Sequence, residues 1–363
     1  MIPTLDLIVQ PAIAPAYSLA ADRHFLHAVG HPSRTRLGVL RVYDFAGDVL
    51  SLGRYHLAPA PMAPAQSTPT AVPVHRRFSG GRAVPFGDGF VGVALFLPHR
   101  SALYGNDPLT LAPYQVPNRY VRGVLEACRL AGLEVFYPGR DVITANRRVL
   151  GMVSFEVQRS GAMVFEAILA VQRDFSLLPR LLEQADPAGA VKAQMLMPHD
   201  TTCLERELQT SLTTEELAHL IRRGYETQFN LLLEAHSLSP LEERAIAAAA
   251  HEFHDDRWLR QRQLRPDLDR HAWTRVQLGM FEAYFGLEQG RFLREVVFAG
   301  DFIANSPAIE RLEHDLRLCP AEWRSIDAVV SDVFAQPENY ILGIGHARTV
   351  SDTICKGIEA IEA

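Results

Sequence analysis

Between residues 37 and 98 the chain alternates short apolar runs with residues typical of turns. The runs are rich in Val, Leu, Phe and Tyr, and they cover residues 37–45, 48–56, 72–77 and 90–98. Such runs predict β-strands, because branched and aromatic side chains suit a pleated sheet. Residues 59–73, PAPMAPAQSTPTAVP, predict a loop, since repeated proline fits neither a helix interior nor a sheet.

The rest of the chain divides into one further strand region and a mainly helical part. Apolar residues recur at helical spacing over 116–131, and residues 133–172 alternate in the manner of three antiparallel strands with turns at Ala145-Asn146 and Ser160-Gly161. Further helices are predicted at 177–185, at 213–233, from Pro240 to about His254, from Ser306 and from about Ala321. Thr213 and Glu216 have the spacing of a capping box. Residues 273–302 predict a hairpin that turns at 288–290.

This order of elements predicts an α+β fold in two domains. Residues 1–236 would form a large domain in which a mostly antiparallel sheet is flanked by helices, and residues 237–363 a small C-terminal α+β domain. The length of 363 residues supports two units, because one hydrophobic core rarely organises so long a chain.

Composition and charge exclude several classes of protein. The formal net charge is −6, so general nucleic-acid binding, which depends on excess positive charge, is not expected. No uncharged apolar stretch reaches roughly 18 residues, so no membrane span is expected, and prolines in the N-terminal apolar run argue against a signal peptide. Four widely separated cysteines without a CxxC pair fit neither a zinc site nor a disulfide framework, and they suit the cytoplasm.

Two features narrow the possible chemistry. Lysine occurs only at Lys192 and Lys356, so a reaction that needs an ammonium group has two candidates. The segment RRFSGGRAV (76–84) follows a predicted strand. Its paired glycines allow the backbone to approach a ligand closely, and its arginines offer forked donors to carboxylate or phosphate.

That segment is one of four motifs that occur in a fixed order. They are SLGRYH (51–56), RRFSGGRAV (76–84), FYPGRDV (136–142) and RRVLG (147–151). In this order they resemble the lipoate–protein ligase A family, within the group of biotin/lipoate ligases and octanoyltransferases. Members of that family carry an SLGR.Q strand, an RR.SGGGAV.H loop, a GRND turn and an RK.SGSA hairpin. The stretch REVVFAGDF (294–302) resembles part of their small accessory domain, so the resemblance spans nearly the whole chain.

The resemblance implies the biotin/lipoate ligase fold and a two-step reaction. Lipoate or a related medium-chain acyl group would react with ATP, with Mg²⁺ present, to give an acyl-adenylate. The adenylate would then acylate a lysine on the lipoyl domain of a 2-oxoacid dehydrogenase or on a glycine-cleavage carrier protein. Because two anions must meet, such a site needs fixed positive charge and backbone donors where charge develops.

Carried over position by position, the resemblance also implies a set of site residues. The acyl-adenylate pocket would be lined by Arg54, Arg77, Ser79, Gly80, Gly81, Ala83, Asp141 and Gly151. Arg148 and Arg82 would neutralise phosphate and carbonyl oxygens, and Asp141 would help to place the metal or the adenylate. We therefore expect the glycine loop and the later hairpin to converge on one cationic slot.

The sequence departs from the family pattern within this pocket. Arg82 replaces the third loop glycine, Pro85-Phe86 stands where a histidine is expected, and Arg148 replaces the hairpin lysine. The SGSA and HGT motifs become Leu150-Gly151-Met152-Val153 and Glu166-Ala167-Ile168. An arginine can neutralise phosphate, but its planar fork is no substitute for a compact ammonium.

Three interpretations stay open. The pocket is re-tuned for ligation, or it has lost catalysis and binds lipoyl domains or acyl ligands, or the protein is an acyltransferase that uses a cysteine. For the last, Cys203 in the predicted loop HDTTCLERE is the better candidate, because Cys128 lies in an apolar helix.

Overall fold

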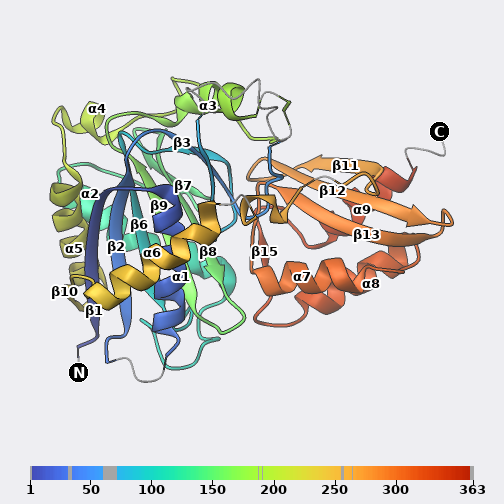
Figure 1. Cartoon of the computed structure of the whole chain (residues 1–363), viewed down its shortest axis with the longest axis horizontal. Helices are drawn as coiled ribbons and strands as arrows, with labels where there is room; N and C mark the ends of the chain where they lie inside the picture. The colour runs from blue at the N-terminus through green and yellow to red at the C-terminus, as the bar shows by residue number, and fades with distance from the viewer. Residues whose placement is uncertain are drawn as a thin grey trace.

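A computed structural model of the chain describes residues 2–31, 35–59, 72–186, 188–189, 191–254, 257–263 and 265–359. Its main sheet has seven strands in the order β10-β1-β2-β6-β9-β8-β7 (Figure 1). The strands are β1 (Thr4–Ile13), β2 (Gly38–Phe45), β6 (Phe90–Leu97), β7 (Val142–Ala145), β8 (Arg148–Val157), β9 (Met163–Ala170) and β10 (Leu232–Ala235). β1 pairs in parallel with β2 and β10, and the remaining neighbours are antiparallel.

Helices cover both faces of this sheet. On one face, α2 (Val116–Leu130) and α5 (Thr214–Phe229) bury their apolar sides against residues such as Val42 and Phe165. On the other face lie α1 (Pro15–Val29) and α6 (Pro240–His254), which pack on residues such as Val39 and Phe96. Thr213 and Glu216 form the expected capping box at the start of α5, so the backbone donors of its first turn are satisfied.

A second, small sheet carries the glycine loop. It is formed by β3 (Val49–Leu52), β4 (Val74–Arg76) and β5 (Val84–Phe86) in the order β4-β3-β5, and α3 (Leu178–Ala185) packs on it. The glycine-arginine segment links β4 to β5, next to the edge of the main sheet at which β7 and β8 lie (Figure 1).

The C-terminal elements form a unit with its own core, which we call the C-terminal unit (residues 270–359). Three antiparallel strands, β11 (Arg270–Arg275), β12 (Met280–Glu288) and β13 (Phe292–Gly300), pack against α7 (Ser306–Asp315), α8 (Trp323–Phe334) and α9 (Arg348–Glu359). β14 (Ile303–Ala304) pairs with β15 (Ile341–Leu342). The remaining short helices are α4 (Leu204–Leu208), η2 (Pro113–Gln115), η3 (Phe175–Leu177) and η4 (Leu259–Gln261).

The predicted α+β fold, with a helix-flanked sheet and a small C-terminal unit, is confirmed. The predicted strands, the helices at 116–131 and 240–254, and the hairpin at 288–290 all recur in the structure with shifted ends. The N-terminal strand β1 and helix α1 were not anticipated, and the predicted helix at 213–233 ends at Phe229 because Asn230 takes a left-handed conformation. Most of the predicted loop at 59–73 lies outside the described residues.

The domain boundary near residue 237 stays a prediction. Helix α6 follows that point in the sequence, yet it packs against α1 on the large sheet (Figure 1). The strands of the C-terminal unit begin only at Arg270. By contact, therefore, α6 goes with the large sheet.

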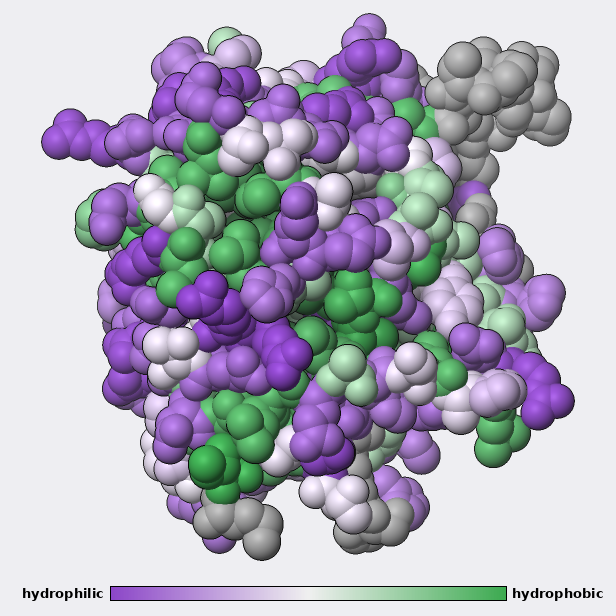
Figure 2. Space-filling model, turned by 90° about the vertical axis from the view of Figure 1, so that its left-hand side faces the viewer, coloured by the Kyte–Doolittle hydropathy of each residue, from purple (hydrophilic) through white to green (hydrophobic). Residues whose placement is uncertain are grey.

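None of the helices in the described ranges combines the length and apolar character that crossing a bilayer requires. Apolar side chains on the α2 and α5 side gather in separate patches divided by polar ones (Figure 2), with Phe136 and Leu232 among the exposed residues of the chain.

Candidate active site

The glycine loop, residues Ser79–Arg82, is a tightly packed turn. Gly81 has φ +83°, a conformation that side chains with a Cβ rarely adopt. A Cβ on Gly53 of the preceding strand connection would lie 2.1 Å from the Gly81 carbonyl oxygen, and one on Gly80 would lie 2.4 Å from the Phe302 carbonyl oxygen. Glycine is therefore required here so that three backbone segments can touch.

Arg77 holds the shape of the loop from inside. Its guanidinium donates to the carbonyl oxygens of Gly80 at 2.9 Å and Arg82 at 2.6 Å, and the Ser154 hydroxyl of β8 also donates to Gly80 at 2.9 Å. Burial lowers the pKa of Arg77, and the nearby Glu166 carboxylate opposes that shift. These contacts make Arg77 a support of the loop backbone.

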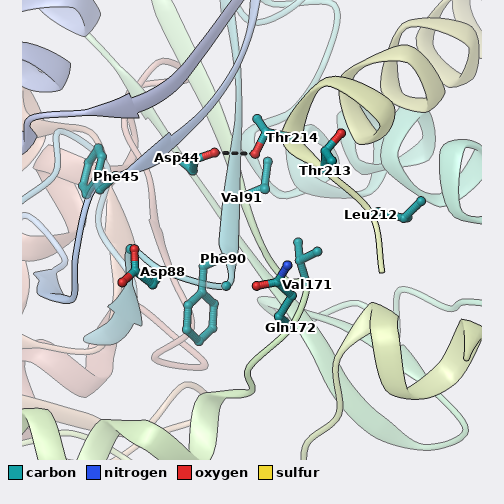
Figure 3. A pocket seen from close by; sticks show the side chains of 12 residues that line it. Asp44, Phe45, Asp88, Phe90, Val91, Val171, Gln172, Leu212, Thr213 and Thr214 are labelled. Atoms are coloured by element: carbon teal, nitrogen blue, oxygen red, sulfur yellow. Dashed lines mark hydrogen bonds between the residues drawn. The ribbon is translucent and has the colours of Figure 1, made fainter. Parts of the chain in front are cut away.

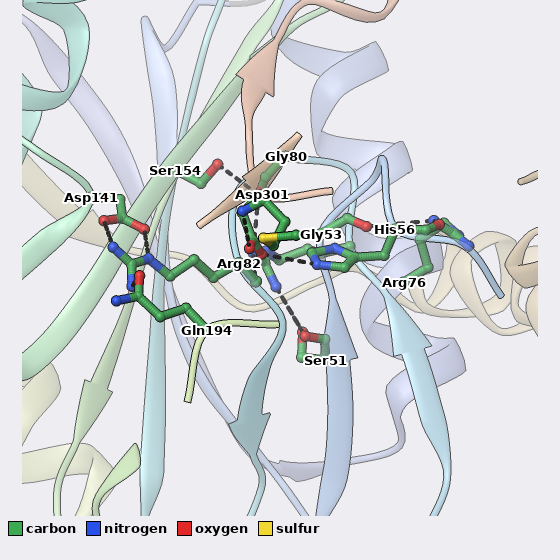
Figure 4. Close-up of polar contacts among 12 residues, drawn as sticks. Ser51, Gly53, His56, Arg76, Gly80, Arg82, Asp141, Ser154, Gln194 and Asp301 are labelled. Atoms are coloured by element: carbon green, nitrogen blue, oxygen red, sulfur yellow. Dashed lines mark hydrogen bonds and ion pairs between the residues drawn. The ribbon is translucent and has the colours of Figure 1, made fainter. Parts of the chain in front are cut away.

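Arg82 and Asp141 come together as the sequence predicts for one site. Arg82 donates through Nε at 2.6 Å and through Nη2 at 3.1 Å to the two carboxylate oxygens of Asp141 (Figure 4). Its Nη1 donates to Gln194 at 2.7 Å. Both charged residues are buried, and burial raises the pKa of Asp141 although Arg82 opposes this. The result is a fixed, bidentate ion pair beside the loop.

The C-terminal unit closes over the loop. The Gly81 amide donates to the Phe302 carbonyl oxygen at 2.7 Å, and the Phe302 ring stacks on Tyr55 with centroids 4.4 Å apart. His56 Nε2 lies 3.1 Å from Asp301 Oδ1, in the same contact (Figure 4). In this arrangement the Gly81 amide already donates within the protein and is not free to bind a ligand.

The structure does not bring Arg148 to the loop. Arg148 opens β8 and forms a 2.6 Å ion pair with Glu207 of α4, whose carboxylate also accepts from Thr202. The β8 residue that contacts the loop is Ser154, six positions further on, which corresponds to about 20 Å of strand. Burial alone would raise the pKa of Glu207, but hydrogen bonds from Thr202 and Asn146 and the charge of Arg148 lower it.

The remaining predicted pocket residues have separate surroundings. Gly151 lies inside β8, where a Cβ would meet Leu169 at 2.8 Å, and Ala83 is buried in the small apolar cluster under β3. Arg54 faces a cleft of about 200 Å³ between the two units, 4.0 Å from Glu310 and stacked over Trp258. These three residues do not line one slot.

Cys203 borders an open cavity of about 470 Å³ next to α4. Its thiol donates to the Gln172 carbonyl oxygen at 3.4 Å and is almost completely buried. The loop that carries it pairs with β8, since the Thr202 amide donates to the Val149 carbonyl oxygen at 2.9 Å. Cys128, by contrast, lies in the apolar core, where burial raises its pKa to about 12.

A further cavity, of about 270 Å³, lies beyond one end of the sheet (Figure 3). Asp44 of β2 accepts a hydrogen bond from Thr214 at its rim, and Asp88 and Gln172 also line it. None of the predicted site residues takes part in it. Among the residues that the structure describes, no group of three or more His, Cys, Asp or Glu side chains could hold a metal ion.

One of the two lysines lies in the segment that contacts Arg82, although it was not assigned to the pocket from the sequence. Lys192 lies two positions before Gln194, the side chain that binds Arg82, and its exposed ammonium donates to the Gly189 carbonyl oxygen at 2.6 Å. The available signal was composition, because Lys192 is one of two lysines in the chain. The contact between Gln194 and Arg82 depends on a long loop that sequence spacing does not specify.

Comparison with known proteins identifies the family. The family model for the lipoyl protein ligase A/B catalytic domain matches residues 14–226, more than half of the chain. The chain belongs to the lipoyl protein ligase A/B family. Its matched region contains the glycine loop, Asp141 and the β8 hairpin, so the resemblance predicted from four motifs is confirmed.

Solved structures of lipoyl ligases share the fold at low sequence identity. *Plasmodium falciparum* LipL1 in complex with lipoate has a TM-score of 0.68 and 13% identity, with 97% of this chain and 99% of that chain covered. A lipoate–protein ligase A bound with ATP has a TM-score of 0.52 and 16% identity over 71% of this chain and 96% of that one.

A third structure comes from an archaeal lipoylation system of *Thermoplasma acidophilum*, described as a bipartite lipoate protein ligase and its E2 lipoyl domain. It has a TM-score of 0.56 and 13% identity over 72% of this chain and 98% of that one. No curated protein matches the sequence. At these identities the solved structures establish the shared fold. The reaction of this member has to be argued from its own residues.

Proposed function

We propose that the protein activates a carboxylic acid as its adenylate and transfers the acyl group to a lysine of a lipoyl domain. The carrier would belong to a 2-oxoacid dehydrogenase or to the glycine-cleavage system. One observation carries the proposal. The glycine loop ends in Arg82, which pairs with the buried Asp141, and Gln194, which also accepts from Arg82, follows Lys192 by two positions in the sequence.

The chemistry needs these groups together. In the first step a carboxylate oxygen bonds to the α-phosphorus of ATP, and the bond from that phosphorus to pyrophosphate breaks. In the second, the carrier lysine attacks the acyl carbon, AMP leaves, and the new amide nitrogen loses a proton. Arg82 would bind the phosphate oxygens, and Lys192 would supply the compact ammonium that Arg148 lacks. The loop amides would bind the developing negative charge.

The residues present are compatible with Mg²⁺ in one respect. This ion binds through one or two carboxylates together with substrate phosphates, and Asp141 is a carboxylate beside the loop. Bound with ATP, Mg²⁺ would neutralise phosphate charge. Since both Asp141 oxygens accept from Arg82, Asp141 can bind the ion only when Arg82 turns toward the nucleotide.

Access to the loop also requires a rearrangement. Phe302 occupies the Gly81 amide, so the C-terminal unit has to move away before a ligand can use that donor. Arg148 would similarly have to leave Glu207 to reach a phosphate. Ligation therefore needs an open form in which these pairs exchange partners.

A second candidate function follows from the same pairs. If Arg82 stays with Asp141 and Arg148 with Glu207, neither charge is available to phosphate, and the protein binds an acyl ligand or a lipoyl domain without ligation. A third, cysteine-dependent acyl transfer, is favoured by the cavity beside Cys203, whose loop is bonded to β8.

Exchange of labelled pyrophosphate into ATP in the presence of an acid tests the proposal. We expect exchange by the wild-type protein, a fall of about 100-fold or more in Lys192→Gln, and no change in Lys356→Gln, the matched control on α9. A lipoyl domain that binds but is not modified would support the second candidate. Acyl transfer without ATP that is lost in Cys203→Ser would support the third.

A further inference from the structure

A row of polar residues crosses the main sheet directly beneath the glycine loop. Strand pairing sets Arg41 of β2 opposite Ala94 of β6, Ala94 opposite Glu166 of β9, and Glu166 opposite Ser154 of β8. Residues that face each other across antiparallel strands point to the same side of the sheet. At the end of this row, which we call the polar row, Ser154 donates to Gly80 of the loop.

The row is deeply buried and charged. Arg41, Glu166 and Ser154 are each at most 5% exposed, and Asp22 of α1, which pairs with Arg41, is 3% exposed. Arg77 completes the set from the loop side, and its charge lowers the pKa of Glu166, which burial raises. Two guanidinium groups thus balance two carboxylates in the interior.

The hydrogen bonding of the polar row is incomplete. Arg41 Nε donates to Gln10 at 2.7 Å and Nη1 to Asp22, but Nη2 has no partner. Glu166 Oε2 likewise has none, although Ser79 lies close enough to lower the pKa of this carboxyl. A buried polar atom without a partner costs about 1–3 kcal/mol, and more when charged, so a bound group that satisfied Arg41 and Glu166 would stabilise the row.

The residue between Arg41 and Glu166 in the row has a small side chain. Ala94 contributes only a methyl group between Arg41 and Glu166, whose strands are two spacings apart, or about 10 Å. Arg41 Nη2 needs an acceptor, and Glu166 Oε2 needs a donor. A second charge is disfavoured, because the four existing charges already balance.

We propose that the polar row binds the far end of the acid substrate, and that this end is an uncharged group with both a hydrogen-bond acceptor and a donor, such as a carboxamide. The inference rests on the proposed function for the placement of the acid's carboxylate at the glycine loop. A purely apolar chain end would leave Arg41 and Glu166 unpaired, and a site of this kind rejects a ligand that lacks the matching polar groups.

The test compares three acids of equal chain length by isothermal titration calorimetry with the full-length protein. Octanoic acid has an apolar end, suberic acid a charged end, and suberic acid monoamide the uncharged polar end. We expect the monoamide to bind about tenfold tighter than either of the others. Equal or tighter binding of octanoic acid, or no binding of any acid, would overturn the inference.

A variant without the Asp22–Arg41 ion pair separates a loss of binding from a failure to fold. Replacing the ion pair with two apolar residues, Asp22→Leu with Arg41→Leu, leaves no unpaired charge, and such exchanges are often tolerated. We expect this variant to lose most of the preference for the monoamide, because only Glu166 remains to bind the polar end. Arg129→Leu, on the exposed side of α2, is the matched control and should keep the wild-type order. An unchanged preference in the double variant would contradict the proposal.

The two proposals can fail separately. Preferential monoamide binding without pyrophosphate exchange would reject ligation and retain the polar row as a ligand site. Exchange that depends equally on all three acids would retain ligation and reject the polar end group. A crystal structure with the monoamide would decide the placement, and ordered water alone at Arg41 and Glu166 would overturn it.

Discussion

The two faces of the main sheet are built from neighbouring residues with opposite character. Phe165 and Glu166 are adjacent in β9, and Leu40 and Arg41 are adjacent in β2, yet Phe165 and Leu40 belong to the apolar core under α2 and α5. Arg41 and Glu166 face the glycine loop side and carry charge. Both faces bury an apolar core, but the face under α1 and α6 also accepts buried charges that cost desolvation. Such a face is where a binding role is expected.

The largest effect should come from the apolar face. Phe165→Ala removes a fully buried ring that packs on Tyr120, and the cavity left behind should lower the free energy of unfolding by about 3–5 kcal/mol. Urea denaturation of this variant beside Glu166→Gln, its neighbour on the other face, measures the difference. A larger loss in Glu166→Gln would reverse the comparison.

Breaking the buried pair on the charged face should cost slightly less. Arg41→Leu leaves Asp22 without its partner, which should lower the free energy of unfolding by about 3 kcal/mol at pH 8. Burial already raises the pKa of Asp22 to about 7, so at pH 6 the carboxyl takes up a proton and the loss should shrink. The double variant with Asp22→Leu should recover most of the stability. A loss that is independent of pH would contradict this account.

A buried carboxyl on the charged face should make the stability of the fold depend on pH. Burial raises the pKa of Glu156 from 4.5 to about 7, and its carboxylate holds Ser306 at the start of α7. An acid whose folded-state pKa is raised favours the folded state when protonated, so this stabilising term is lost as the pH rises from about 4.5 to 7.

Glu156→Gln should remove that dependence. Between pH 5 and 7 we expect the wild-type protein to lose about 2 kcal/mol more stability than the variant does. Urea midpoints measured across this range check it, and parallel curves for the two proteins would show that Glu156 does not titrate as inferred.

The smallest effect on stability is expected at the partly exposed Arg148–Glu207 pair. The Arg148 side chain is 35% exposed in its pair with Glu207, so Arg148→Gln should change the free energy of unfolding by about 1 kcal/mol or less. Arg82→Gln, which breaks a pair buried on both sides, should cost clearly more. Thermal unfolding of the two variants compares them directly, and equal costs would show that burial does not separate the two arginines.

Much of the fold could be predicted because its signals are local. Apolar runs identified β2 and β6, alternating apolar residues identified β8 and β9, and the Thr213–Glu216 box identified the start of α5. The N-terminal strand β1 was missed, since Pro11 interrupts an apolar run that becomes a strand only between β2 and β10. Propensity is a weak guide where tertiary pairing decides.

The candidate site likewise has features that local sequence signals predict and features that depend on tertiary packing. The motifs located the glycine loop and Asp141, and the Arg82–Asp141 pair shows that two of them meet. The distance from Arg148 to the loop, the Phe302 contact and the Gln194 contact with Arg82 could not be predicted, because each depends on strand register or on how distant segments pack.

By itself the sequence determined the family, the kinds of element and the loop that needs glycine, because these depend on residue type and local spacing. Only the tertiary structure decided which charges meet. Arg41, Glu166 and Ser154 are more than a hundred residues apart at the extremes, and they form one row because four strands align in register. Hydrogen bonds between strands set that register, and no single segment encodes it.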